Sequence, residues 1–381
     1  MNFSRNQTVS VLGLPLASLT LDQAVDRIEE LILEGGVHQV ATANLNSWLE
    51  SAGDAYLHRV LAACDLVLAD GMPLVWASRM LGSVLPARII AVDIIPRLLA
   101  LSSAKGYRIF LLGDRADVAD RARELFESKF PGVHICGAYA PPAGAMKQME
   151  HNQIVEKVRA AGPDILLVGF EDSRQEKWIA ANLERLGVPV AMGVGASLSV
   201  VLGDRKRAPR WMRNTGLEWL LRLAQEPGRL APRYWNDLVG LTSRLPLALA
   251  ASWAQPRYHG PTTTSRTHNS TFLHLHVAGS VNAALTPVIN RAVEDCIGEM
   301  KLLCIHMDRV AWVDAEGLGL LLDARRRLLN AGLTLQTAKV PAGLRFRFFA
   351  WCVGPLLEEL TPRSLPAVTK ESVPAMHANK N

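Results

Sequence analysis

Short apolar runs alternate with segments of helical periodicity through the first 200 residues, and this alternation constrains the fold more than any other feature. Runs rich in Val, Ile, Leu and Ala predict strands at residues 39–43, 66–68, 108–112, 134–137, 165–168 and 190–194. The spacing between them predicts helices at residues 22–33, 118–130, 153–161 and 175–186. Continuous apolar strands separated by helices form parallel sheets that helices cover on both faces. The sequence therefore predicts an α/β domain built on a parallel sheet.

A second, smaller domain follows a polar stretch. Residues 255–270 are rich in Pro, Thr and Ser, which is typical of an interdomain linker. Beyond it, the pattern predicts strands at 271–279, 301–307 and 334–340 and helices at 283–299 and 316–331. With 381 residues, 49% apolar, the chain can bury two ordinary cores. We expect a first domain at 1–245, a linker at 246–270, a small α/β domain at 271–365 and a flexible tail at 366–381.

No segment predicts a membrane span. The N-terminus loosely imitates a signal peptide, but Pro15 and Asp22 interrupt it. The uncharged run at 186–203 contains Pro189 and four glycines, so it is better interpreted as a strand, a turn and a short helix. The five cysteines are odd in number and scattered, and no CxxC occurs. This pattern predicts a reducing, cytoplasmic setting with neither disulfides nor a zinc site.

Residues 205–245 form a basic appendage to the first domain. Within 205–235, eight Lys or Arg stand against two acidic residues, a surplus greater than the +5 of the whole chain. Arginine with interleaved aromatic rings suits a membrane surface, where cations meet lipid phosphates. The candidate membrane-surface residues are Trp211, Trp219, Arg222, Arg229, Arg233 and Trp235. A solvated helical hairpin packed on the domain accounts for the same charges equally well. No nucleic-acid module accompanies them, so no nucleic-acid partner is expected.

Polar residues follow several of the predicted strands. Asp70 stands between an apolar strand and Gly71, where a carboxylate can act as a general base or simply form an Asp-Gly turn. Thr42 and Asn44 end the preceding strand and can bind substrate or cap the next helix. Gln175 begins a helix after a glycine turn. Ligands of open α/β sheets bind beyond the carboxyl ends of strands, so the glycines there are candidate nucleotide contacts or plain strand ends: Gly113, Gly169, Gly193 and Gly195.

Seven motifs in order carry a family resemblance across about residues 8–240: VATANLN, LADGMPLVWASRMLG, PARIIAVDIIPRLL, YRIFLLGD, PDILLVGFEDSRQEKWI, VAMGVGASLSVVLGDRKRAPRWM and GLEWLLRLAQEPGRLAPRYW. Together they resemble the WecG/TagA/CpsF glycosyltransferases of bacterial polysaccharide and teichoic-acid synthesis. The resemblance implies a Rossmann-like domain with a basic appendage that helps complete the site. It implies inverting, metal-independent transfer of an N-acetylmannosamine-type sugar from a UDP-sugar. The implied acceptor is a polyprenyl-diphosphate-linked sugar at the cytoplasmic face of the membrane.

The same resemblance assigns roles to individual residues. Asp70 is the implied base that deprotonates the acceptor hydroxyl, and Thr42, Asn44 and Gln175 position substrates near it. Arginines offset the diphosphate charge, because a guanidinium binds phosphate bidentately. No cofactor and no metal are expected, and the UDP-sugar is a substrate. The implied substrate-binding residues, with the strand-end glycines, are Arg88, Asp93, Gly113, Gly169, Gly193, Gly195, Arg207, Arg210 and Arg213.

Some positions depart from the family pattern. Glu171 and Ser173 stand where a Gly and a Pro are usual, and Leu198-Ser199 replaces a usual Phe-Asp. Extra carboxylates near a pyrophosphate are repulsive unless they are paired. These departures motivate an alternative, a non-catalytic scaffold that binds nucleotide-sugar or lipid without turnover. Self-association into a homo-oligomer is compatible with both hypotheses.

The second domain resembles a STAS domain over about residues 270–362. The segment MDRVAWVDAEGLGLLLDARRRLLNAGLTLQ has the strand, turn and helix of that family. STAS domains often carry a phosphorylated Ser in an Asp-Ser-Ser-Gly turn, whereas Ala315 and Glu316 stand here. Ala315 has no hydroxyl, and Glu316 puts a fixed negative charge at the helix start. The sequence predicts a docking module held in one state for an unknown protein partner, or else an appendage that stabilises the fold.

Overall fold

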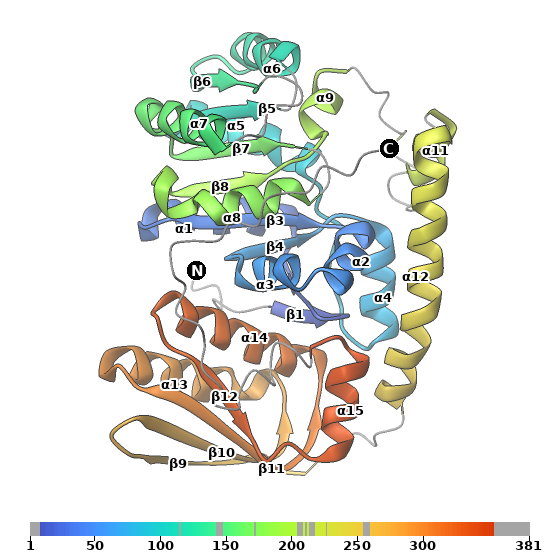
Figure 1. Ribbon diagram of the computed structural model, residues 1–381, viewed down its shortest axis with the longest axis vertical. Helices are drawn as coiled ribbons and strands as arrows, with labels where there is room; N and C mark the ends of the chain where they lie inside the picture. The colour runs from blue at the N-terminus through green and yellow to red at the C-terminus, as the bar shows by residue number, and fades with distance from the viewer. Residues whose placement is uncertain are drawn as a thin grey trace.

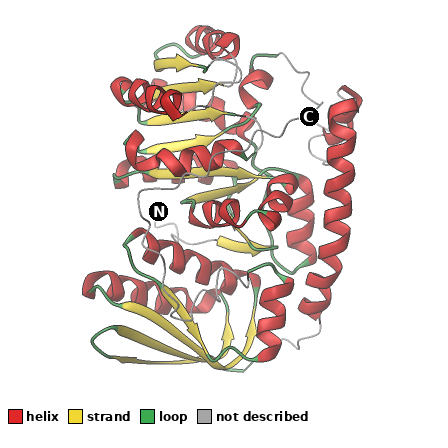
Figure 2. Cartoon of the chain, viewed as in Figure 1, coloured by secondary structure: helices red, strands yellow, loops and turns green. Residues whose placement is uncertain are grey.

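A computed structural model gives the fold of the chain. It describes residues 8–113, 116–141, 148–170, 173–203, 209, 212, 218–225, 227–253 and 260–353. Figure 1 shows a larger unit built on a parallel sheet, a smaller α/β unit beneath it, and a long helix, α12, that runs beside both. Figure 2 shows helices on both sides of the strands in the larger unit, and helices above the strands in the smaller unit. The predicted tail at 366–381 lies outside the described residues.

The larger unit contains a six-stranded parallel sheet with the order β4-β3-β8-β7-β5-β6. All its paired strands run parallel, which confirms the predicted fold class. Each strand falls where a continuous apolar run predicted it. The strands are β3 (His38–Ala43), β4 (Leu66–Ala69), β5 (Arg108–Gly113), β6 (His134–Tyr139), β7 (Ile165–Gly169) and β8 (Val190–Gly193).

Helices cover both faces of this sheet. Strand residues such as Leu68, Ile109 and Met192 share one apolar core with three long helices and the short α9 (Ser197–Val201). Their neighbours, such as Phe110 and Ala191, face the other side. The first face is covered by α1 (Leu21–Glu34), α5 (Ala91–Lys105) and α6 (Ala116–Lys129). The second is covered by α7 (Gln148–Ala161) and α8 (Arg174–Leu186), and near β3 and β4 by α2 (Leu45–Gly53), α3 (Ala55–Ala63) and α4 (Met72–Met80).

The smaller unit is the predicted second α/β domain. Its sheet has the order β12-β11-β10-β9, with β10, β11 and β12 parallel and β9 antiparallel to β10. Its strands are β9 (Thr263–His268), β10 (Phe272–Val281), β11 (Leu302–Val313) and β12 (Leu335–Ala338). Its helices are α13 (Thr286–Glu299), α14 (Ala315–Asn330) and α15 (Ala342–Ala350), with a 3₁₀ turn at Ala283–Leu285.

The predicted linker at 246–270 is wrong in two parts. Helix α12 (Pro227–Trp253) continues through 246–253, because the apolar residues Ala248 and Ala251 are buried. Trp351 fixes this end of the helix, since its Nε1 donates to the Ala248 carbonyl oxygen at 3.2 Å. Residues 263–268 form β9, an exposed edge strand that pairs with β10. Its polar composition is typical of a linker, but hydrogen bonds to β10 hold this segment in the sheet.

A hairpin at the N-terminus joins the two units. It consists of β1 (Thr8–Val11) and β2 (Leu14–Ala17), and its tip packs against the end of α15. Trp48 Nε1 donates to the carbonyl oxygen of Leu12 at 2.8 Å. A Cβ on Gly13 would lie 2.8 Å from the Cys352 carbonyl oxygen, and one on Gly319 of α14 would lie 2.0 Å from the Thr8 carbonyl oxygen. Close backbone contact therefore requires glycine at Gly13 of the hairpin and at Gly319 of the smaller unit. One apolar core spans both units.

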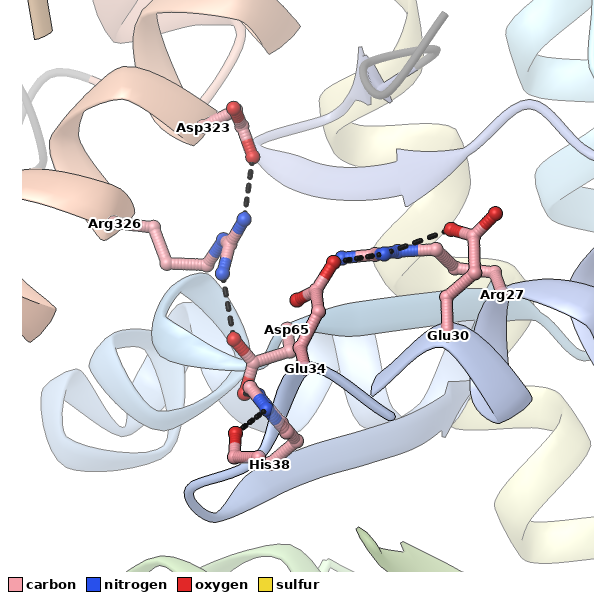
Figure 3. Close-up of polar contacts among 8 residues, drawn as sticks. Arg27, Glu30, Glu34, His38, Asp65, Asp323 and Arg326 are labelled. Atoms are coloured by element: carbon pink, nitrogen blue, oxygen red, sulfur yellow. Dashed lines mark hydrogen bonds and ion pairs between the residues drawn. The ribbon is translucent and has the colours of Figure 1, made fainter. Parts of the chain in front are cut away.

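Charged side chains also cross between the units. The interdomain ion cluster consists of His38, Asp65, Asp323 and Arg326, which Figure 3 shows beside the pairs that Arg27 makes. Arg326 Nη1 lies 2.6 Å from Asp65 Oδ1 and Nη2 lies 2.7 Å from Asp323 Oδ1. Burial opposes the charge of Asp65, but His38 and Arg326 together hold its pKa below the usual value. The Asp65 carboxylate in turn raises the pKa of His38.

Candidate active site

The carboxyl ends of β3 and β4 place two polar side chains next to each other. Ala43 pairs with Ala69 in the ladder, and the backbone N–H of Asp70 donates to the Ala43 carbonyl oxygen at 2.8 Å. Asp70 and Asn44 therefore leave adjacent strands at the same level. Gly71 has φ 138, a conformation that residues with a Cβ rarely adopt, and the chain turns there into α4. The half-buried Asp70 thus lies at the carboxyl-terminal edge of the sheet.

Thr42 connects β3 to β8, the neighbour on its other side. Its Oγ1 donates to the Gly193 carbonyl oxygen at 3.3 Å, and the residue is buried. Asn44 caps α2, because its Oδ1 accepts from the Ser47 N–H at 3.0 Å. Both residues lie at the carboxyl-terminal end of β3, the edge of an open α/β sheet where ligands bind. Both residues therefore shape the rim of the candidate site.

Gln175 supports the turns beside this rim. Its Oε1 accepts from the Gly195 N–H at 2.7 Å, and its Nε2 donates to Glu176 Oε1 at 2.8 Å. A Cβ on Gly193 would lie 2.9 Å from the Gln175 side chain, and one on Gly169 would lie 3.1 Å from the Gly195 carbonyl oxygen. Close packing thus accounts for these glycines directly. The close contacts between Gln175 and these turns support the candidate site. We call it the strand-end site and define it as Thr42, Asn44, Asp70, Gln175, Gly193 and Gly195.

Arg88 reaches the same edge from the segment after α4. The N–H of Ile89 donates to the Ala69 carbonyl oxygen at 2.9 Å, so this segment follows the end of β4. Arg88 Nη1 lies 2.9 Å from Glu218 Oε2, and both side chains are largely buried. Glu218 begins α11 (Glu218–Gln225), so the appendage meets the sheet edge at this ion pair. Arg88 is therefore already paired with a carboxylate in this structure.

Other predicted substrate-binding residues are spread along the edge or lie outside the structure. Gly113 ends β5, which two strands, β7 and β8, separate from β3. Asp93 lies in the first turn of α5, where its N–H donates to the Ile90 carbonyl oxygen at 3.0 Å. The structure does not bring Gly113 onto the strands that carry Asp70. Arg207, Arg210, Trp211 and Arg213 lie outside the described residues.

Sequence reasoning missed a group of polar residues where α12 crosses α2. Glu50 of α2 accepts hydrogen bonds from Asn46 Nδ2, at 2.7 Å, and from Ser173 Oγ. Asp237 of α12 is buried, and burial, with a contribution from the nearby Glu50, raises its pKa to about 6. Three distant segments supply these residues, so no local motif marks them. Ser173, one of the departures from the family pattern, is the single signal in the sequence.

The appendage exposes aromatic and aliphatic side chains. Trp219 and Trp235 are 40% and 67% exposed, and Trp219 meets Tyr234 edge to face at 5.9 Å. Leu238 and Val239 are also exposed and lie three and four residues after Trp235, on one side of α12. Arg233 is half-buried. The side chains of Arg222 and Arg229 lie outside the described residues. Among the described helices, none has the length and apolar character to cross a membrane.

The start of α14 lies against the rest of the chain. Asp314 caps the helix, and its Oδ1 accepts from the Gly317 N–H at 2.7 Å. Ala315 is 4% exposed and belongs to the core that both units share, whereas Glu316 is exposed. The position that carries a Ser in the STAS pattern is therefore inaccessible here. Helix α14 packs on β1, so the N-terminal hairpin already occupies one of its faces.

An acidic residue among polar groups at the carboxyl-terminal edge of a parallel sheet is typical of the α/β proteins that bind ligands at the strand ends. The arrowheads of β3, β4, β7 and β8 point toward the side where α11 and α12 run (Figure 1). Residues 9–257 match the glycosyl transferase WecG/TagA/CpsF family. The match spans more than half of the chain, so the chain belongs to this family and is a glycosyltransferase, as the motifs predicted.

Three similar proteins bear the name N-acetylglucosaminyldiphosphoundecaprenol N-acetyl-beta-D-mannosaminyltransferase. That of Bacillus subtilis is 29% identical over 224 residues, which cover 58% of this chain and 86% of the relative. That of Bacillus spizizenii is 28% identical over 265 residues, covering 69% and 99%. One from Staphylococcus aureus is 26% identical over 230 residues, covering 60% and 88%. Among solved structures, the unphosphorylated anti-sigma factor antagonist SpoIIAA matches 23% of this chain and 83% of its own, at 16% identity and a TM-score of 0.21.

Proposed function

We propose that the chain transfers an N-acetylmannosamine-type sugar from a UDP-sugar to a polyprenyl-diphosphate-linked acceptor, with inversion at the anomeric carbon. The observation that carries this proposal is Asp70, which follows β4 beside Asn44 at the carboxyl-terminal edge of the sheet. The names of the three relatives support an acceptor built on a diphosphoundecaprenol-linked sugar. The donor nucleotide follows from the family resemblance alone.

Asp70 is the general base in this proposal. Its carboxylate takes the proton from an acceptor hydroxyl while that oxygen attacks the anomeric carbon of the donor. The bond between that carbon and the diphosphate oxygen breaks, and the bonding electrons leave with UDP. A positioned base of this kind contributes about 10²- to 10⁴-fold to a rate. Thr42 and Gln175 act through the Gly193 and Gly195 turns, which they hold beside the base.

Leaving-group charge has to be offset by cations of the chain in this proposal. Arg88 stands at the edge but is paired with Glu218, the first residue of α11. A diphosphate that binds Arg88 competes with this carboxylate, so donor binding is coupled to the position of α11. The arginines of the appendage then complete the site, as the family resemblance implies, and no metal is required in this scheme. A guanidinium serves this purpose well because it presents two parallel donors to a phosphate.

The acceptor is a lipid, so the proposed enzyme works on the cytoplasmic surface of the membrane. The exposed Trp219, Trp235, Leu238 and Val239 of α11 and α12 support this placement. Helix α11, which carries Trp219, begins at the residue that pairs with Arg88, and this supports a lipid-facing surface close to the strand-end site. Aromatic and aliphatic side chains of such helices insert at the headgroup level. We expect binding to vesicles that contain anionic lipid, and weaker binding as salt is added.

For the second domain we retain two roles. A STAS-like docking module for a protein partner is the role that its sequence pattern favours. The buried Ala315 and the hairpin packed on α14 favour the alternative, an appendage that stabilises the transferase domain. A pull-down with the full chain distinguishes them when Glu316, which is exposed, is replaced by Lys. A docking module loses its partner in that variant, and an appendage shows no specific partner in either form.

The direct test is sugar transfer in vitro. The wild-type chain is offered a panel of labelled UDP-sugars and a short polyprenyl-diphosphate-GlcNAc analogue, and the product lipid is resolved by chromatography. We expect transfer from an N-acetylmannosamine-type donor, abolished in Asp70→Asn and unchanged in Asp120→Asn, whose aspartate is exposed on α6. Binding of UDP without transfer from any donor would instead support the non-catalytic scaffold.

A further inference from the structure

Histidine and cysteine side chains gather on one face of the C-terminal sheet. The sequence pattern is His-x-His on β10, with His274 and His276, and Cys-x-His on β11, with Cys304 and His306. The parallel register pairs His274 with Cys304 and His276 with His306. Because side chains alternate along a strand, all four point to the same face. We call these four residues the histidine–cysteine cluster.

This face lies opposite the helices of the domain. Residues that alternate with the cluster, such as Leu275 and Ile305, are fully buried in the core with α13 and α14. Figure 1 shows α13 and α14 together on one side of the sheet that contains β10 and β11. The three histidines are partly exposed, and Cys304 is 6% exposed. A small ion can therefore reach the cluster from solvent while the thiol remains shielded.

The distances between the polar atoms match a metal centre. His274 Nδ1 lies 3.1 Å from His306 Nε2, and Cys304 Sγ lies 3.7 Å from the same nitrogen. The ligand atoms of these three residues all lie within 4.8 Å of one another. In a tetrahedral zinc site, bonds of about 2.05 Å to nitrogen and 2.3 Å to sulfur put two nitrogens about 3.3 Å apart and nitrogen and sulfur about 3.5 Å apart. Both observed distances agree with these values to within about 0.3 Å.

A hydrogen bond between His274 and His306 is the simpler interpretation, but it does not explain why Cys304 also approaches the same nitrogen of His306. Two donors or acceptors, from His274 and Cys304, converge on the single Nε2 atom of His306. A neutral ring nitrogen has one proton or one lone pair, so it forms one good hydrogen bond. A metal ion between the three atoms binds all of them at once. Its binding displaces the proton of the Cys304 thiol, which passes to solvent.

We propose that His274, Cys304 and His306 bind one divalent transition-metal ion of the zinc class. Two imidazoles and one thiolate suit Zn²⁺ or Co²⁺ and disfavour Mg²⁺ and Ca²⁺, which prefer oxygen ligands. Three protein ligands leave a fourth position for water or another donor. His276, the remaining member of the cluster, stacks on the His306 ring at 4.2 Å. A second grouping, His276, His306 and Asp308, shares His306 with the first and uses an exposed carboxylate in place of the thiolate. The thiolate favours the first grouping for a zinc-class ion.

This site differs from the one proposed for sugar transfer. It lies in the second domain, on a sheet that contributes no residue to the strand-end site. Its ion is not assigned any part in the transfer, so the two proposals fail independently. The sequence alone gives no zinc motif here, for a physical reason. The ligands are about 30 residues apart in the chain and come together only through parallel pairing of β10 and β11.

The test is a cobalt titration of the full chain, produced without a histidine tag and treated with a chelator. We expect one Co²⁺ to bind per chain, with a thiolate-to-cobalt charge-transfer band in the near ultraviolet and the strong visible bands of a tetrahedral site, and Zn²⁺ to displace it. Cys304→Ser should remove the charge-transfer band, and His274→Gln and His306→Gln should each weaken binding by at least about tenfold. Cys136→Ser and His268→Gln are matched controls outside the cluster and should bind as the wild type does.

Circular dichroism checks that each variant remains folded. The proposal is overturned if the folded wild-type chain binds no Co²⁺ or Zn²⁺ at micromolar concentrations. It is also overturned if the charge-transfer band survives Cys304→Ser, or is lost in Cys136→Ser instead. If Asp308→Asn abolishes binding while Cys304→Ser leaves it unchanged, the alternative grouping holds the ion, and the assignment to Cys304 is wrong.

Discussion

The interdomain ion cluster should hold the two units together, and Arg326→Met tests this. The substitution removes the cation but keeps most of the side-chain volume. It leaves the carboxylates of Asp65 and Asp323, whose side chains are 7% and 6% exposed, without their shared partner. Loss of one partner from a buried ion pair costs about 3–5 kcal/mol. Because Asp65 keeps its contacts with His38 and the Gln39 N–H, we expect the lower end, about 3 kcal/mol.

Urea unfolding and thermal melts measure this loss. For a chain of this length, about 3 kcal/mol lowers the melting temperature by about 4 °C. The folded-state pKa of Asp65 is lowered, so its pairing stabilises the fold above its unfolded pKa and this contribution is lost as the pH falls through the folded pKa. We therefore expect the deficit of Arg326→Met to shrink in acid.

The neighbouring residue on α14 supplies the control. Arg327 bonds Asn290 at 2.8 Å and approaches Glu294, whose side chain is 68% exposed. Exposed pairs contribute at most about 1 kcal/mol, so Arg327→Met should cost little. If Arg326→Met unfolds at the same urea concentration as Arg327→Met, the cluster does not couple the units, and the reasoning from its burial is refuted.

Two further predictions concern buried positions. The pKa of Asp237 is raised to about 6 in the folded chain, so the free energy of unfolding should fall as the pH rises from about 4 to 6, by at most about 3 kcal/mol. Asp237→Asn should remove this loss, which urea melts at pH 4 and pH 7 measure. If the difference in unfolding free energy between the variant and the wild type is the same at both pH values, the prediction is contradicted. Gly319→Ala places a Cβ 2.0 Å from the Thr8 carbonyl oxygen and should destabilise the chain by at least about 1–3 kcal/mol. Gly298 lies in α13 with open space around it, so Gly298→Ala should leave the stability unchanged or raise it. Calorimetry compares the two variants, and equal losses of stability in both would refute the packing argument.

Local apolar pattern was sufficient to predict most of the fold. The strands of the parallel sheet are buried on both faces, so each is a continuous apolar run that stands out from its flanks. Strand β9 was missed because an exposed edge strand with the sequence TTSRTH has no apolar face. The end of α12 was missed because the predicted linker included the mostly apolar residues 246–253 together with the polar stretch at 255–270, whereas burial against α15 sustains the helix there.

The shared core between the units could not be predicted from the sequence. It depends on close approach at Gly13 and Gly319, where backbone from distant segments comes within van der Waals contact. Glycine is common in turns and occurs in helices that nothing approaches, as at Gly298, so its position in the sequence gives no warning of such a contact. The same limit applies to the ion cluster, because Asp65 and Arg326 are separated by most of the chain.

The residues of the candidate site were also predicted only in part. Asp70, Asn44 and Thr42 were predicted, because each ends a strand and the strand ends of a parallel sheet share one edge. Glu50 and Asp237 were not, because they meet only where α12 folds back over α2. Gln175 was predicted as a positioning residue, and its hydrogen bond to the Gly195 N–H gives that position a physical basis.

The turnover number of Asp70→Asn, with saturating donor and acceptor, tests the central claim most directly. The amide keeps the shape of the side chain but cannot take a proton. We expect kcat to fall by about 10²- to 10⁴-fold while the KM for the acceptor changes little. A fall of less than about tenfold in a folded variant would show that another group removes the proton from the acceptor.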